Sequence, residues 1–336
     1  MLEPFLSVVT TTYNSSRHIV EFLNEVQSVL TEIDCPSEII VVDDGSQDTT
    51  VAICREQLKA RPELTLIELS RNFGQEAATL EALRRARGQF IFLLDSDLEE
   101  PPHTLIEMLA VMREERPPVD VVFGIQARRS GTIYHTFLGS LFYKVVNRFS
   151  EVEIPQDVLP IRLMRRRYVD ALLMHTERAL ALTGLFVLTG FEQKAIKVTK
   201  VYKGYSSYNL KKRLALLFRY LLIFSWKPAM AITILGFFSA LIAVFFGIYA
   251  VAIEVFSEKT VPGWASLASL IVFFNGILLI SVGTCAAYLA FIFQEVKGRP
   301  VTIVKSVSGR NGTLLEPSVP LVKAGRGCSR KNATTL

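Results

Sequence analysis

Two aspartates one residue apart, Asp95 and Asp97, are the residues of this chain best suited to chemistry. They follow a mostly apolar run, 89–94, which predicts a buried strand that ends at the first carboxylate. Residues i and i+2 of an extended segment point to the same side, so the two carboxylates can share one ligand. Oxygen ligands suit Mg²⁺ or Mn²⁺, which would neutralise both charges. Taken alone, the pair is more typical of an acidic turn that caps the next helix.

The segments before this pair predict the scaffold that positions it. Hydrophobic periodicity predicts strands over 5–12, 38–42, 64–69 and 89–94, and helices over 18–30, 49–60 and 75–87. Strands and helices that alternate in this way indicate an α/β fold with a parallel sheet and right-handed crossovers. In such sheets, ligands bind beyond the carboxyl ends of the strands, which is where the aspartate pair lies.

Polar residues follow every one of these predicted strands. They are Tyr13 after the first, Asp43 and Asp44 after the second, Asn72 to Gly74 after the third, and Asp95 and Asp97 after the fourth. One such group is ordinary turn chemistry, whereas four along one sheet edge predict a cleft. The chain has neither the glycine-rich dinucleotide motif nor a P-loop. A nucleotide is therefore expected to be held by acids at its base and ribose, and by a metal at its phosphates.

Composition narrows the class of protein. The chain has 336 residues, a formal charge of +5, and 50% hydrophobic residues. The modest charge does not indicate a nucleic-acid partner. The four cysteines and four histidines are scattered, which argues against a disulfide framework or a zinc site and fits a reducing compartment.

Two long uncharged stretches, 229–253 and 264–293, predict transmembrane helices, because about 20 apolar residues span a bilayer. Basic residues flank their outer ends, so the positive-inside rule places both termini and the catalytic domain in the cytosol. The segment 210–227 has leucines on one face and basic residues on the other. It predicts an amphipathic helix at the lipid surface, the alternative being an ordinary core helix. The sequence thus indicates an integral membrane protein in contact with the lipid bilayer.

Four regions follow from these patterns. They are an α/β catalytic domain (1–209), a juxtamembrane amphipathic helix (210–227), a two-helix transmembrane hairpin (228–294) and a basic cytosolic tail (295–336). The tail is expected to be disordered beyond about Val304, with an electrostatic preference for anionic lipid.

The motifs together resemble those of family 2 glycosyltransferases of the polyprenyl-phosphate type, which includes dolichol-phosphate-mannose synthase and bacterial undecaprenyl-phosphate sugar transferases. The motifs lie at 8–14, 41–46, 70–77 and 94–98, with 224–228 before and 295–300 after the apolar pair. The resemblance covers roughly residues 5–305.

This resemblance implies a GT-A fold, which is Rossmann-like with a mostly parallel sheet, and a nucleoside-diphosphate sugar donor, with UDP as the expected carrier. Mg²⁺ or Mn²⁺ on Asp95 and Asp97 would hold the diphosphate. The donor-binding residues implied are Thr11, Tyr13, Asp43, Asp44, Asn72, Phe73, Gly74 and Asp95. The product would be a lipid-linked sugar for modification of the cell envelope, made at a bacterial inner or plasma membrane.

The acceptor implied is polyprenyl phosphate, whose oxygen attacks the anomeric carbon with inversion. A phosphate monoester is already ionised near neutral pH, so a strong general base is less necessary than for an alcohol. It requires cationic residues that hold it in line with the sugar. Candidates are Arg128, Arg129, Lys144 and Arg162, of which Arg128 and Arg162 are best supported by position; Asp157 and Asp97 complete the predicted catalytic set.

Two departures from the family pattern concern the acceptor side. Pro160 stands where relatives carry an aspartate before the arginine, and Ser207 stands where they carry a lysine. Lys200 or Lys203 is a candidate to supply the missing positive charge.

Other functions are weighed against this one. A processive polysaccharide synthase would need a Q-x-x-R-W run, which is absent. A degenerate scaffold or flippase partner would tolerate loss of the metal carboxylates, and both are present. A transporter is disfavoured because neither uncharged stretch contains an ionisable path. A homo-oligomer and a flippase partner are expected by resemblance alone.

Overall fold

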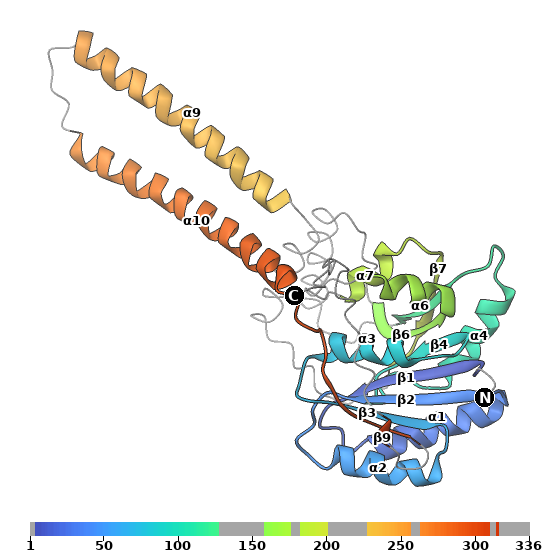
Figure 1. The fold of residues 1–336 in the computed structure, drawn as a ribbon. Coiled ribbons are helices and arrows are strands. Elements are labelled where there is room, and N and C mark those ends of the chain that lie inside the picture. The colour runs from blue at the N-terminus through green and yellow to red at the C-terminus, as the bar shows by residue number, and fades with distance from the viewer. Residues whose placement is uncertain are drawn as a thin grey trace, which may run out of the picture.

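The computed structural model describes residues 4–127, 158–175, 182–200, 227–256, 263–309 and 314–315. Its strands are β1 (Leu6–Thr12), β2 (Ser37–Asp43), β3 (Leu64–Leu69), β4 (Phe90–Leu93), β5 (Val121–Gln126), β6 (Val158–Arg165), β7 (Gln193–Val198), β8 (Val304–Ser308) and β9 (Leu314–Leu315). Within these residues they form one nine-stranded sheet in the order β7-β5-β6-β4-β1-β2-β3-β8-β9 (Figure 1).

The centre of the sheet is parallel, as the alternation of strands and helices predicts. Strand β1 pairs in parallel with β2 and β4, and β2 pairs in parallel with β3. Strand β6 runs antiparallel to both β4 and β5, whereas β7 is parallel to β5. The carboxyl ends of β1 to β4 therefore share one edge of the sheet.

Helices cover both faces of this sheet. They are α1 (Ile19–Ile33), α2 (Thr50–Ala60), α3 (Gln75–Arg85), α4 (Thr104–Glu114), α6 (Arg166–Leu173) and α7 (Leu182–Leu188), and two longer helices follow, α9 (Lys227–Phe256) and α10 (Trp264–Val296). The apolar stripes of α1, α2 and α4 form one core with one face of the central strands. Those of α3, α6 and α7 form a second core on the opposite face. Strands buried on both faces account for the nearly continuous apolar runs in β1 to β4.

Strand β4 is shorter than its apolar run suggests. It ends at Leu93, and the two aspartates lie in the turn that follows. The expectation that Asp95 and Asp97 occupy an extended segment is therefore wrong. Their carboxylates are instead oriented by hydrogen bonds, from the Gln75 side chain to Asp95 and from the Glu99 amide to Asp97.

Strand β8 corrects a second expectation. Residues 304–308, predicted to begin a disordered tail, pair antiparallel with β3 and extend the sheet. Val307 is buried there in the core that contains α3. The amide of Ser70 also donates to the carbonyl of Ile303 at 2.9 Å. The segment after α10 is thus part of the same folded unit as the segment before α9.

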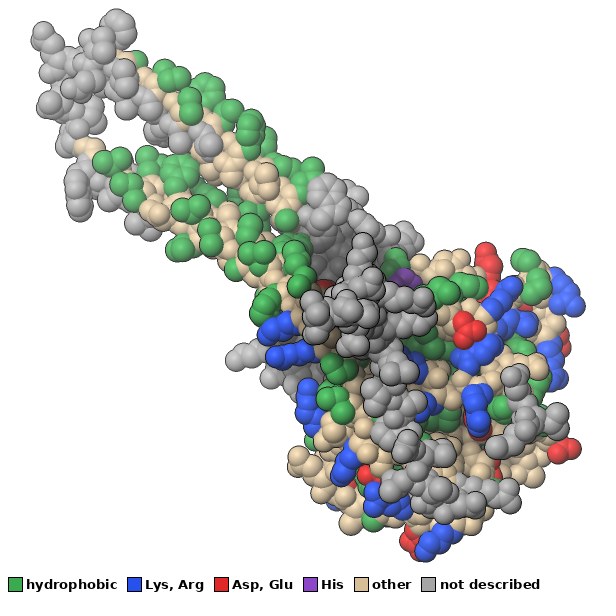
Figure 2. All heavy atoms as spheres, in the orientation of Figure 1, with side chains coloured by type: hydrophobic (Ala, Val, Ile, Leu, Met, Phe, Trp, Pro, Cys, Tyr) green, Lys and Arg blue, Asp and Glu red, His purple; other side chains and the backbone are tan. Residues whose placement is uncertain are grey.

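Helices α9 and α10 lie side by side and extend away from the α/β domain (Figure 1). Large apolar side chains such as Phe237, Phe245 and Leu279 are exposed along them (Figure 2). By length and composition, the described part of the chain holds one helix that could cross a bilayer, Phe273–Val296 within α10, with a mean hydropathy of 2.2.

Several predictions fall outside the described residues. They concern Arg128, Arg129, Lys144, Asp157, Lys203 and nearly all of the amphipathic segment 210–227.

Candidate active site

The four polar groups predicted to follow strands β1 to β4 meet at one edge of the sheet. The amide of Asp44 donates to the carbonyl of Thr12 at 2.9 Å, which fixes the end of β2 against the end of β1. The hydroxyl of Ser96 donates to the carbonyl of Thr11 at 3.0 Å, which fixes the turn after β4 against the same strand. Backbone contacts therefore hold the predicted donor-binding residues together.

Asp44 organises the loop after β3. Its two carboxylate oxygens accept hydrogen bonds from the amides of Phe73 at 2.7 Å and Gly74 at 2.9 Å. Burial raises the pKa of Asp44, and these two amides oppose that effect. Gly45 makes the close approach possible: it has a φ of +72°, and a Cβ there would lie 2.5 Å from the carbonyl carbon of Arg71.

Asp43 is held inside its own turn. One carboxylate oxygen accepts the amide of Ser46 at 2.9 Å, and the other accepts the Ser46 hydroxyl. Burial raises the pKa of Asp43, the bonds from Ser46 lower it, and the charge of Glu68 raises it further. A carboxylate that is buried but already paired in this way can orient a polar group of a ligand without moving.

Two aromatic rings flank these acids. Tyr13 is 45% exposed, beside the turn in which the side-chain oxygen of Asn14 accepts the amide of Gln47 at 2.9 Å. The ring of Phe73 lies beneath the guanidinium of Arg71, 4.0 Å from the ring centroid. The exposed ring of Tyr13, next to fixed carboxylates, can stack on a flat, polar ligand such as a nucleoside base.

The turn after β4 concentrates negative charge. It carries four acids within six residues: Asp95, Asp97, Glu99 and Glu100. Burial raises the pKa of Asp95 to about 7, as do the charges of Glu100 and Asp97, against opposing contributions from Lys200 and Gln75. The side-chain amide of Gln75, the first residue of α3, donates to Asp95 at 2.8 Å. Asp95 is therefore a buried acid in a negative surrounding, to which Glu100 contributes more than Asp97.

The shape of this turn is strained. Leu98, between Asp97 and Glu99, has a φ of +59°, a left-handed conformation that costs a non-glycine residue about 1–2 kcal/mol. Its side chain is buried in the core, and the amide of Glu99 donates to the carboxylate of Asp97 at 2.9 Å. Burial and this hydrogen bond hold a conformation that the chain would not adopt otherwise.

The donor set of this turn fits Mg²⁺ or Mn²⁺. Among the described residues, no group of three or more His, Cys, Asp or Glu side chains is arranged to hold a metal ion. Two carboxylates match the way in which Mg²⁺ is bound in nucleotide enzymes, by one or two carboxylates together with substrate phosphates and water. The metal role of Asp95 and Asp97 stays a prediction with suitable chemistry.

Lys200 also reaches this turn. Its ammonium donates to Glu99 at 2.9 Å and lies 3.0 Å from an oxygen of Glu100, which is 1% exposed. It follows β7, at the outer edge of the sheet, which the sequence analysis does not predict as a strand. Gln75 likewise carries no local signal beyond its place in a family motif. Both contacts join residues far apart in the sequence.

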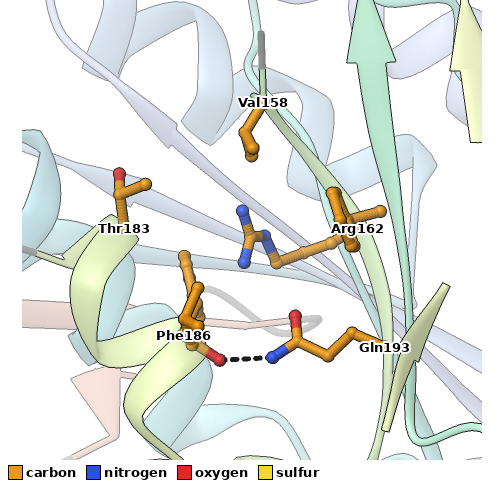
Figure 3. Close-up of a pocket in the computed structure, with 7 residues that line it drawn as sticks. Val158, Arg162, Thr183, Phe186 and Gln193 are labelled. Atoms are coloured by element: carbon orange, nitrogen blue, oxygen red, sulfur yellow. Dashed lines mark hydrogen bonds between the residues drawn. The ribbon is translucent and has the colours of Figure 1, made fainter. Parts of the chain in front are cut away.

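Arg162 pairs across β6 and β4 with Leu93, two residues before Asp95, but its side chain is enclosed. It is 3% exposed, and its guanidinium packs 3.5 Å from the centroid of the Phe186 ring on α7 (Figure 3). It donates to the carbonyl of Pro160 at 3.2 Å, and no carboxylate among the described residues is a cause of its pKa shift. Burial lowers the pKa of Arg162 to about 10.

The cavity beside Arg162 is small. Its volume of about 10 Å³, between residues such as Val158, Thr183 and Gln193, is roughly that needed by one water molecule. Gln193 and Tyr168 both donate to the carbonyl of Phe186, at 2.6 and 2.9 Å, and so hold α7 over the arginine. The structure thus brings together the predicted donor residues but encloses Arg162, while Arg128 and Asp157 lie outside the described residues.

Comparison with known proteins identifies the family of the chain. Residues 7–173 match the family described as glycosyl transferase family 2. A putative glycosyltransferase of Mycobacterium tuberculosis (strain CDC 1551 / Oshkosh) is 34% identical over 93% of this chain and 91% of its own length. A bactoprenol glucosyl transferase derived from the SfII prophage of Shigella flexneri is 28% identical over 89% of this chain and 97% of its own length.

Among solved structures, the mannosyltransferase PcManGT from Pyrobaculum calidifontis, in complex with GDP-Man and Mn²⁺, has a TM-score of 0.43 and 18% identity, with 88% of this chain and 87% of that chain covered. That likeness is too distant to assign a ligand. The sequence relationships are sufficient: the chain belongs to glycosyl transferase family 2 and is a glycosyltransferase.

Proposed function

We propose that this enzyme transfers a sugar from a nucleoside-diphosphate sugar, with UDP as the carrier, to polyprenyl phosphate at the inner face of a bacterial membrane. The observation that carries the proposal is the similarity to bactoprenol glucosyl transferases along nearly their whole length. This similarity spans the apolar helices as well as the α/β domain. The product would be a polyprenyl-phosphate sugar that supplies cell-envelope glycan modification.

The donor would bind along the edge formed by β1 to β4. The base and ribose would contact Thr11, Tyr13, Asp43 and Asp44, next to the loop of Asn72, Phe73 and Gly74. In support, Asp43 and Asp44 are already oriented by hydrogen bonds from Ser46, Phe73 and Gly74. Groups fixed before binding lose little conformational entropy when the ligand arrives.

Asp95 and Asp97 would hold Mg²⁺ or Mn²⁺. When bound, the ion supplies charge neutralisation for the diphosphate that leaves. The residues themselves contribute a fixed site: Gln75 orients Asp95, and the Glu99 amide orients Asp97. The Gln75 bond also links the acidic turn to the start of α3, directly after the Phe73–Gly74 loop.

The acceptor phosphate would be bound by cationic side chains, with Arg128 and Arg162 as proposed ligands and Asp157 nearby. Arg162 has the chemistry for this task, because it is a buried cation for which no carboxylate partner is found among the described residues. Since it is enclosed by Phe186, it could reach a phosphate only if α7 shifts. Attack by the phosphate oxygen would invert the configuration at the anomeric carbon.

The apolar helices would form a hairpin in the bilayer, with both outer ends in the cytosol. The pairing of β8 with β3 supports this topology, because the chain after α10 returns to the same sheet as the chain before α9. Exposed apolar side chains along α9 and α10 would then face lipid (Figure 2). The proposal includes self-association in the membrane and delivery of the product to a flippase.

A direct assay tests this function. Membranes that contain the full-length enzyme are incubated with undecaprenyl phosphate and a panel of UDP- and GDP-sugars, and lipid products are identified by mass spectrometry. One UDP-sugar is expected to give a polyprenyl-phosphate sugar, with loss of product in EDTA and recovery with Mn²⁺. Undecaprenol, which lacks the phosphate, is the matched control and should yield nothing. Transfer to undecaprenol, or full activity in EDTA, would contradict the proposal.

A further inference from the structure

We propose that Lys200 is a positioning residue that keeps Glu99 and Glu100 from competing with Asp95 and Asp97 for the divalent cation. The inference rests on the proposed metal role of the two aspartates. It concerns a different question, namely why a turn with four acids would bind a cation at one pair and not at the other.

The geometry pairs this lysine with the second half of the acidic turn. The ammonium lies 2.9 Å from Glu99 and 3.0 Å from Glu100, whose side chain is almost completely buried. The contact to Glu99 spans 101 positions in the sequence, and it draws the segment after β7 across the edge of the sheet. The ammonium of Lys200 therefore engages Glu99 and Glu100, the second pair of acids in the turn.

A mobile or unpaired Glu100 would be a strong competitor for the metal. Carboxylates bind hard divalent cations whenever their oxygens can converge, and all four acids lie within six residues. Glu100 also acts electrostatically on Asp95, since its charge is among the causes that raise the pKa of that aspartate. An ammonium tethered between Glu99 and Glu100 occupies their oxygens and offsets part of their charge, so that the metal ion is held at the first pair, next to the donor.

Lys194 provides a matched control for Lys200. Lys194, in β7, forms an ion pair of 3.0 Å with Glu115, at the end of α4 and away from the acidic turn. Both partners of this pair are at least 31% exposed, so it is an ordinary surface contact. Replacing Lys194 removes an equal charge from a neighbouring position without touching the proposed site.

Metal binding is the first test. Binding of Mn²⁺ alone to the full-length protein in detergent is followed by the EPR signal of free Mn²⁺. Removing a unit positive charge near a divalent cation at a partly solvated site is expected to tighten binding by about tenfold in Lys200→Met. Lys194→Met should match the wild type, and Lys200→Arg should restore wild-type binding.

Turnover should move in the opposite direction. Lys200→Met is expected to lower the rate of sugar transfer at saturating Mn²⁺ by about tenfold, because the cation is then drawn toward Glu100 and away from the donor. A merely structural lysine would weaken binding and turnover together. Tighter binding with slower transfer is the signature of competition.

The outcomes separate the two proposals. A wild-type protein that does not bind Mn²⁺ overturns the metal site and the inference together. A wild type that binds Mn²⁺, with binding by Lys200→Met equal or weaker, overturns only the inference.

Because a buried Glu100 without its partner could unfold the protein, the double variant Lys200→Met, Glu100→Gln is measured as well. It should fold and transfer sugar within about threefold of wild type, since the buried competitor is gone and the remaining Glu99 is 35% exposed and screened by solvent; transfer as slow as in an Asp97→Asn variant would refute competition.

Discussion

The two ends of the central sheet treat buried carboxylates in opposite ways. At the amino ends of the strands, Glu38 is 6% exposed and fully paired: it accepts from the Ser7 hydroxyl at 2.6 Å, the Arg87 amide at 2.7 Å and the Arg87 guanidinium at 2.8 Å. At the carboxyl ends, the turn from Asp95 to Glu100 holds four acids, two of which, Glu99 and Glu100, share the ammonium of Lys200. The buried acid at the amino ends thus has a guanidinium to itself, whereas two acids at the carboxyl ends share one ammonium.

This difference separates a structural acid from a functional one. A buried carboxylate that is paired with a guanidinium, as Glu38 is with Arg87, contributes to folding and does not require a metal ion. Acids that raise one another's pKa, as in the case of Asp95, are held by the fold at a cost to stability. That cost is understandable if a cation binds there during the reaction. We therefore expect variants at the carboxyl ends of the strands to change activity, and variants at the amino ends to change stability.

The largest effect is expected at the carboxyl ends. Asp97→Asn should lower sugar transfer by about 100-fold or more, because a proposed metal ligand loses its charge, while the melting temperature changes little. Transfer of radiolabelled sugar to polyprenyl phosphate and thermal unfolding measure the two quantities. Glu107→Gln, at an exposed acid on α4, is the control and should leave both unchanged. Normal turnover in Asp97→Asn would remove the metal role from this residue.

The reverse pattern is expected at the amino ends. Glu38→Gln should lower the free energy of unfolding by about 2 kcal/mol, because the guanidinium of Arg87 loses a buried, charged acceptor. Transfer per folded molecule should stay at the wild-type rate, since the network lies at the opposite end of the strands from the site. Urea unfolding in detergent and the transfer assay on the same sample check both statements. A large loss of turnover in a folded Glu38→Gln protein would break the comparison.

The sequence is sufficient to predict the parts of this fold that local patterns encode. Strands β1 to β4 and helices α1 to α4 have regular apolar periodicity, and parallel topology brings the ends of the four strands to one edge. The donor-side cluster of Asp43, Asp44 and Gly74 follows from that rule alone. The aspartate pair is predicted correctly in place but not in conformation, because β4 ends at Leu93 and Leu98 turns the chain.

Contacts between distant segments are what the sequence does not reveal. Strand β8 is a short segment within a basic region, and only its pairing with β3 makes it a strand. Lys200 becomes informative once β7 places it beside Glu99 and Glu100. Resemblance identifies Arg162 as a charge of interest, yet nothing local to it indicates that Phe186 encloses the guanidinium.

Strand β8 gives a smaller, purely structural prediction. Val307→Ala should lower the free energy of unfolding by about 1–2 kcal/mol, because Val307 is 3% exposed in the core that contains α3. Lys305→Ala, at an exposed position of the same strand, is the control and should be neutral. Urea unfolding of the full-length protein distinguishes the cases. Equal stability of both variants would mean that this segment is not part of the sheet in solution.

The smallest expected effect on stability concerns Asp48, which connects the turn after β1 to the turn after β2. Asp48 accepts the amide of Thr50 at 3.0 Å and the amide of Ser16 at 3.3 Å, and so joins the turns after β1 and β2. Burial alone would raise the pKa of Asp48, but the hydrogen bonds from Thr50 and Ser16 lower it to about 2. A folded-state pKa below the unfolded value of 3.8 adds stability that is present above pH 3.8 and is lost as pH falls through 2.

Asp48→Asn should therefore be less stable than the wild type at pH 7, by less than about 1 kcal/mol because the side chain is exposed and solvent screens its charge. The difference should persist at pH 5 and shrink as the pH falls below 3.8, where the unfolded carboxyl is already protonated. Urea unfolding at pH 7, 5 and 3 measures this trend. A difference that grows toward acid would mean that Asp48 is not stabilised as a carboxylate. A difference that is independent of pH would mean that its charge makes no contribution to holding the donor-side turns.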